Sequence, residues 1–267
     1  MGHTRLGPIP KTSKWAEVVS LFVETEDKEQ AYISPSDIKV IAQQAINAAE
    51  GGIEKAIKDD GLIFSFYLLT QIALAARYAD WQERLSRQGI QLSHDATVFD
   101  LTAEVQNTID DFLLKKTRPT DISEMAQQAL GETLTNATSQ QTLSLFRGNM
   151  NELQSALRQF STREGFAELG RTFFSTFIFR FLNFFLSRVT AANLGRLKVR
   201  SVAQISEFNN ALRRHCYQSA LLVRDFCGEW FSKTEYQEGI NFDNTSRFVA
   251  VALKKIQAEI QQQRAGQ

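Results

Sequence analysis

The residues of this sequence best suited to chemistry are three histidines and two cysteines, and their spacing matches no catalytic or metal-binding motif. His3, His94 and His215 lie far apart, and neither His-Glu-x-x-His nor paired cysteine and histidine ligands occur, so no metal site is expected. Cys216 follows His215 directly, but neighbours on a helix point about 100° apart, which does not make a nucleophile–base pair. Walker loops, glycine-rich nucleotide fingerprints and nucleophile elbows are also absent from the sequence. We therefore favour a non-catalytic protein without a cofactor, while an active site assembled from distant residues stays open.

Basic residues gather after the middle of the chain. The segment "NLGRLKVRS" follows a predicted helix, and cations near a helix end complement its dipole, with Gly195 typical of a C-terminal cap. Helix capping is therefore the favoured interpretation, and contact with phosphate is the alternative. Known nucleic-acid modules interleave aromatic residues with such a patch, and this pattern is missing here. The candidates for anion binding are Arg188, Arg196, Lys198, Arg200, Arg213 and Arg214.

A second candidate surface is aromatic. The stretch "DFCGEWFSKTEYQEG" places Trp230, Phe231 and Tyr236 around a helix break that we expect at Gly228. Aromatic residues in an irregular connection usually pack back onto the core, but they are also the residue types that anchor protein partners. These three residues are therefore candidates for an interface with a protein partner or with a second copy of the chain.

The stretch "RTFFSTFIFRFLNFFLSRV", residues 171–189, holds seven of the chain's twenty phenylalanines. On a helix, its apolar side chains leave only a narrow polar strip. A transmembrane segment is not expected, because a central arginine costs about 3 kcal/mol in a bilayer. An interfacial membrane helix would need a broad cationic face. We therefore predict a core helix that buries Phe173, Phe177, Phe181, Phe184 and Phe185, with Arg180 facing a carboxylate or solvent. The strip consists of Thr172, Thr176, Arg180, Asn183 and Ser187.

The elements that position these residues are helices. Apolar residues recur at spacings of three and four, and "SPSD", "STRE" and "SVAQ" are capping boxes that begin at Ser34, Ser161 and Ser201. We predict an all-α fold of about eight to ten helices, with the very apolar segments 62–76 and 173–189 as its central pair.

Cys216 and Cys227 are expected on one helix, about 16 Å apart, and so unable to form a disulfide.

Charge divides the chain into two halves. Residues 1–145 hold thirteen Lys and Arg against twenty Asp and Glu, and residues 146–267 hold seventeen against ten. The favoured interpretation is one domain, 1–267, in which the halves face each other, and the alternative is an acidic subdomain 1–145 and a basic subdomain 146–267 with an acidic partner. The first residues lack a secretory signal, so a cytoplasmic location is expected.

Three functions follow as hypotheses. The first is a non-catalytic helical interaction protein, meaning an adaptor, sensor or structural subunit, whose partner is another protein or a second copy of the chain. The second is a membrane-acting effector that exposes helix 171–189 on activation, although no membrane contact is expected in the resting state. The third is a nucleic-acid or nucleotide binder that uses the basic C-terminal half.

Overall fold

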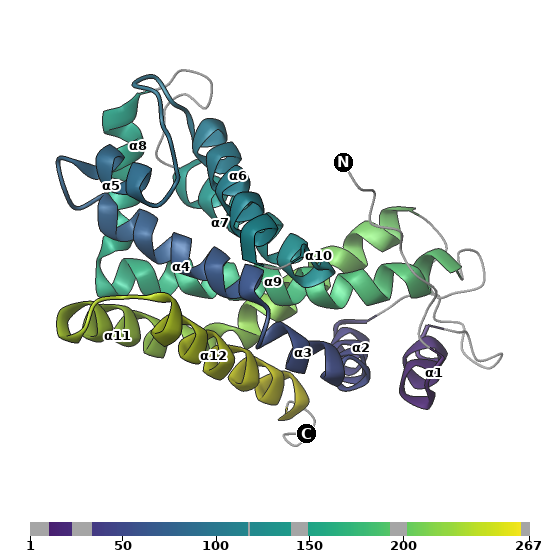
Figure 1. The fold of residues 1–267 in the computed structure, drawn as a ribbon. Helices are drawn as coiled ribbons and strands as arrows, with labels where there is room; N and C mark the ends of the chain where they lie inside the picture. Colours follow the sequence, from purple (N-terminus) through teal and green to yellow (C-terminus); the bar gives the residue numbers. More distant parts are fainter. Residues whose placement is uncertain (1–10, 23–33, 117, 140–148, 193–201, 263–267) are drawn as a thin grey trace.

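The computed structural model describes residues 11–22, 34–116, 118–139, 149–192 and 202–262. Within these ranges the chain forms α-helices, one 3-10 turn (η1, Gln159–Ser161) and no strand, so the all-α prediction is confirmed (Figure 1). There are twelve described helices where eight to ten were expected, because short helices separate the long ones. They are α1 Ser13–Ser20, α2 Pro35–Ala48, α3 Glu50–Ala56, α4 Asp60–Ala75, α5 Trp81–Arg87, α6 Val98–Lys116, α7 Asp121–Ser139, α8 Met150–Arg158, α9 Arg163–Ala192, α10 Val202–Ser219, α11 Leu221–Gln237 and α12 Phe242–Gln262.

Capping chemistry sets where the helices begin. At α2 the Ser34 hydroxyl accepts the amide of Asp37 at 3.2 Å, and the Asp37 carboxylate accepts the amide of Ser34 at 2.8 Å, as the capping box predicts. The predicted cap at Ser161 is wrong by one residue. Ser161 ends the 3-10 turn, and the hydroxyl of Thr162 instead accepts the Gly165 amide at 3.0 Å to start α9. The third predicted box begins at Ser201, which lies outside the described residues.

The core is aromatic at its centre. Phe66 of α4 is fully buried, and its ring lies 4.8 Å from that of Phe174 and 5.4 Å from that of Phe173, both in α9. Phe248 of α12 also stacks on it at 5.5 Å. Helix α4 is buried along most of its length, which explains why its sequence is apolar all round. These contacts join an element of the acidic half to two elements of the basic half.

Two glycines set the close approach of α9 and α11, which lie side by side in Figure 1. A Cβ atom at Gly228 of α11 would stand 2.4 Å from the Arg163 carbonyl oxygen, and one at Gly170 of α9 would stand 2.3 Å from the Cys227 sulfur. The predicted helix break at Gly228 is therefore wrong, because α11 continues through this residue. Its glycine serves helix packing rather than a turn. The chain breaks at Ala220 instead, so Cys216 lies in α10 and Cys227 in α11, not on one helix.

The phenylalanine-rich segment forms part of the thirty-residue helix α9. Phe173, Phe177 and Phe181 are at most 1% exposed, which confirms their predicted burial. Phe184 and Phe185 are only half-buried: Phe184 borders an open cavity beside α7, and Phe185 stacks on Trp15 of α1 at 5.0 Å. Among the described helices, none combines the length and the apolar character that a bilayer crossing requires.

Candidate functional site

The polar strip of α9 faces helix α7 rather than bulk solvent. Arg180, Asn183 and Ser187 line a first cavity between the helices, and Thr172 and Thr176 line a second one. The start of α7 lies beside the end of α9 in one cavity, and the end of α7 lies beside the first half of α9 in the other, so the two helices run antiparallel. An interface between packed helices is usually apolar, and polar groups that line open space there keep capacity to hydrogen-bond a partner. We call this feature the α7–α9 groove.

The opposite wall of the groove was missed from the sequence. It is a second polar strip, on α7, whose members recur at a spacing of four: Glu124, Gln128, Glu132 and Asn136. Residues spaced by four lie on one helix face, so the strip itself was visible in the sequence. What the sequence could not show is that this strip faces the one on α9.

An ion-pair bridge divides the groove into its two cavities. Arg180 donates to the Glu132 carboxylate and to the Gln128 side-chain oxygen, both at 2.7 Å. Arg213 of α10 donates to the other oxygen of the same carboxylate, and its guanidinium lies 4.2 Å from the centre of the Phe179 ring. Glu132 thus holds an arginine from each of two helices. These two contacts are also the ion pairs, among the described residues, that join the acidic half to the basic half.

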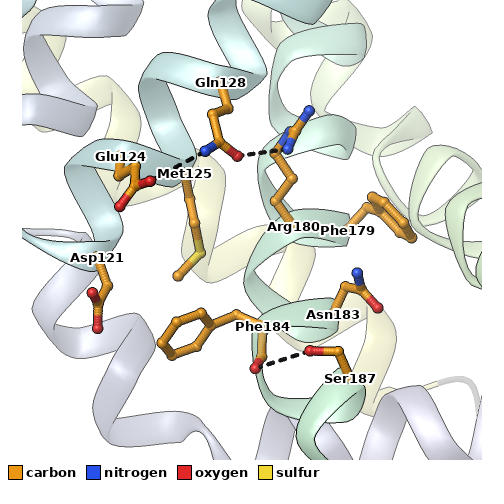
Figure 2. Close-up of a pocket in the computed structure, with 9 residues that line it drawn as sticks. All are labelled: Asp121, Glu124, Met125, Gln128, Phe179, Arg180, Asn183, Phe184 and Ser187. Carbon is orange, nitrogen blue, oxygen red and sulfur yellow. Dashed lines mark hydrogen bonds between the residues drawn. The ribbon is translucent and has the colours of Figure 1, made fainter. Parts of the chain in front are cut away.

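Figure 2 shows the first cavity, which has a volume of about 240 Å³. The Met125 and Phe184 side chains point into it from opposite helices, and the carboxylates of Asp121 and Glu124 lie at its α7 side. The Asn183 amide lies on the facing wall, next to Ser187. The cavity therefore offers an apolar surface beside carboxylate and amide groups, a mixture suited to an amphipathic side chain of a partner.

The second cavity lies on the other side of the bridge, has a volume of about 430 Å³ and is more cationic. Helix α10 supplies Arg213, Arg214, Tyr217 and Gln218 to its wall, and α9 supplies hydroxyl groups. The Tyr217 phenol donates to Glu168, and burial together with this hydrogen bond raises the pKa of Tyr217, which keeps the phenol protonated. The complete lining is Glu132, Asn136, Thr172, Ser175, Thr176, Arg213, Arg214, Tyr217 and Gln218.

His215 and Cys216 do not form a reactive pair. Burial raises the pKa of Cys216 to about 12, so the thiol is protonated and is a poor nucleophile at neutral pH. Burial, assisted by Lys39 and opposed by Glu259, lowers the pKa of His215, whose Nε2 atom is buried with no hydrogen-bond partner among the described residues. Within the described ranges, no three His, Cys, Asp or Glu side chains gather in a way that would hold a metal ion.

The structure describes three of the six predicted anion-binding residues. Arg213 and Arg214 line the second cavity. Arg188 lies near the far end of α9, with its guanidinium 3.9 Å from the centre of the Phe184 ring, and burial lowers its pKa. The other three, Arg196, Lys198 and Arg200, lie outside the described residues.

The three predicted interface aromatics have different environments. Phe231 is fully buried and stacks on Phe166 at 3.9 Å, so it belongs to the core. Trp230 is half-buried and stacks on Phe248 at 4.2 Å. Tyr236 is 92% exposed near the end of α11. Because α11 is continuous, these side chains point in different directions and do not form one surface.

Comparison with known proteins assigns neither a family nor a function to the chain. The chain matches no protein-family model, no curated protein and no solved structure. Its function has to be argued from the groove itself.

Proposed function

We propose that this protein is a non-catalytic helical interaction protein, an adaptor, sensor or structural subunit, that binds a partner protein in the α7–α9 groove. The observation that carries the proposal is the pair of facing polar strips, which meet at the bridge from Arg180 to Glu132 and Gln128 and line a cavity on either side of it. Interfaces between proteins combine an apolar centre with polar groups at the rim, and the first cavity offers both.

Arginine and aromatic residues along the same face add support. The Arg188 guanidinium stacks on the Phe184 ring, which points into the first cavity, and that of Arg213 stacks on Phe179, whose ring points away from Met125. Stacking fixes long side chains before a partner arrives, which reduces the entropy lost on binding. Arginine and aromatic residues are also the types that dominate binding energy at protein interfaces.

The chemistry of the first cavity suggests what it receives. Its carboxylates favour a cationic group, and Met125 and Phe184 favour an aliphatic or aromatic stem. A lysine or arginine side chain of the partner satisfies both, because it carries a charge at the end of an apolar chain. We therefore propose that the partner presents a basic side chain to this cavity.

The membrane-acting alternative is less well supported. Phe173, Phe177 and Phe181 are in the core, so α9 would have to leave the fold before these rings could reach a bilayer. The nucleic-acid alternative depends on a continuous basic patch, and half of its predicted residues lie outside the described ranges.

Affinity enrichment from cells of the native host tests the proposal. The bait proteins are the unaltered chain, Asn183→Arg, which fills the first cavity with a cationic side chain, and Gln237→Arg, which adds the same residue at an exposed position outside the groove. We expect the unaltered chain and Gln237→Arg to recover the same partner, and Asn183→Arg to lose it while melting at the same temperature. Equal recovery by all three baits would contradict binding in the groove.

A further inference from the structure

The second cavity carries an inference that goes beyond partner binding. Its volume of about 430 Å³ lies in the range of small-molecule sites, roughly 300 to 1,000 Å³. It lies across the Glu132 bridge from the first cavity, so a ligand there and a partner in the first cavity need not compete for space.

The charge of this cavity favours an anion. Glu132 is the acidic residue of its lining, and that carboxylate is already bound by Arg180 and Arg213. Arg214 is exposed on α10, lines the same cavity, and has no carboxylate partner among the described residues. The two guanidinium groups of the lining, Arg213 and Arg214, against the one carboxylate leave the site with a net positive charge, and arginine is the residue that best matches a phosphate group.

A hydroxyl group on a mostly buried side chain supplies the second observation. Thr176 lines the cavity and is only 5% exposed, yet its hydroxyl makes no hydrogen bond to another described residue. Its neighbour Ser175 is equally buried and donates to the Thr172 carbonyl oxygen at 3.0 Å, which leaves its oxygen free to accept. The Thr176 oxygen is not among the fully buried polar atoms, so it is open to the cavity and can donate to a ligand oxygen there.

The site is also preformed. Arg213 is fixed between the Glu132 carboxylate and the face of the Phe179 ring. The Arg171 guanidinium lies 3.7 Å from the centre of the Tyr217 ring, and the Tyr217 hydroxyl donates to Glu168, so this lining residue is held in place. Groups that are already ordered lose little entropy when a ligand binds.

We propose that this cavity binds a small phosphorylated metabolite, with the phosphate between Arg213 and Arg214 and a phosphate oxygen accepting from the Thr176 hydroxyl. This site makes the protein a sensor of such a molecule, independently of the partner that we assign to the first cavity.

Isothermal titration calorimetry on the full chain tests the proposal with four probes. Inorganic phosphate reports the phosphate contact alone, while ribose 5-phosphate and adenosine monophosphate distinguish a sugar phosphate from a nucleotide. A single-stranded oligonucleotide tests the nucleic-acid alternative. We expect at least one of the two phosphorylated metabolites to bind, and to bind more tightly than inorganic phosphate.

Two variants locate the site, and two serve as controls. Arg214→Gln should weaken binding at least about tenfold, because it removes a charge-assisted contact to phosphate. Thr176→Val keeps the shape of the side chain, removes only the hydroxyl and should weaken binding by about three- to tenfold. Arg247→Gln removes an exposed arginine from α12 and should bind like the unaltered chain. Asn183→Arg, which fills the first cavity, should also bind the metabolite normally, so failure of the partner proposal and failure of this one are distinguishable.

Several results would overturn the proposal. One is the absence of binding by both metabolites to the unaltered chain. Another is an equal loss of affinity in Arg214→Gln and Arg247→Gln, which would indicate a nonspecific charge effect. The third is an oligonucleotide that binds more tightly than either metabolite with steep salt dependence, which would favour a nucleic-acid site.

Discussion

Replacing Gly228 with alanine tests the packing of α9 against α11. A Cβ atom at this position would stand 2.4 Å from the Arg163 carbonyl oxygen and 2.9 Å from the Ala167 Cβ atom. Both distances are well below van der Waals contact, and the first involves backbone, which cannot rotate away. The two helices would therefore have to move apart along their shared interface.

The magnitude follows from two opposing effects. Overpacking a close-packed interior costs about 1 to 3 kcal/mol, and the backbone contact places Gly228→Ala at the upper end of that range. Alanine in a helix interior gains back about 1 kcal/mol over glycine. The net loss is about 2 kcal/mol, which lowers the melting temperature by roughly 4 to 8 °C for a chain of this size.

A matched control uses Gly51, also in a helix, where an added Cβ atom meets nothing within 4 Å. Gly51→Ala should gain the helix propensity without the clash and be more stable by about 0.5 to 1 kcal/mol. Thermal and urea unfolding of both variants measure these changes, with an unchanged m-value as the check that the unfolded state is the same. A Gly228→Ala protein as stable as Gly51→Ala would refute the packing argument and favour a break in α11.

Three further predictions concern the core. Phe181→Ala should destabilise the protein by about 3 to 5 kcal/mol, because it empties a fully buried site. The unaltered chain should cause no dye leakage from anionic vesicles. Strong leakage by the unaltered chain, together with an unchanged melting temperature of Phe181→Ala, would restore the membrane-acting alternative. Burial lowers the pKa of His215 in the folded protein, so as the pH falls this histidine is protonated first in the unfolded state. The contribution of His215 to the free energy of unfolding should therefore be constant above pH about 6.5 and decrease below it. That fall should shrink in His215→Phe and persist in His94→Gln, which changes an exposed histidine. A thiol reagent should react with Cys216 and Cys227 only after unfolding, since both are buried and burial raises both pKa values; rapid reaction in the folded protein would contradict their placement.

Local signals in the sequence predicted local structure well. The capping box at Ser34 fixed the start of α2, and the periodicity of the phenylalanine-rich segment predicted both a buried face and a polar strip. Arg180 was expected to face a carboxylate or solvent, and it binds Glu132. Such features depend on residues within one or two helical turns of each other, which is the distance over which sequence patterns are informative.

The long-range features could not be predicted in the same way. Gly228 looks identical in sequence whether it ends a helix or admits a neighbouring one, and only the position of α9 decides between them. The second wall of the groove depends on which helix faces the polar strip of α9, and several amphipathic helices were available. The environments of Trp230 and Phe231 likewise follow from the continuity of α11, which the expected break obscured.

The central claim is that the α7–α9 groove is open in the free protein and occupied by a partner in the cell. A single introduced cysteine can report whether the groove is open or occupied, because the native Cys216 and Cys227 are buried and should not react with the labelling reagent. The measurement is the rate of thiol labelling of Asn183→Cys, in purified protein and in lysate of the native host, with exposed Gln237→Cys as the control. We predict rapid labelling of both purified variants, and protection by the lysate of Asn183→Cys alone. Labelling of purified Asn183→Cys as slow as that of the native cysteines, or equal rates with and without lysate, would contradict the account.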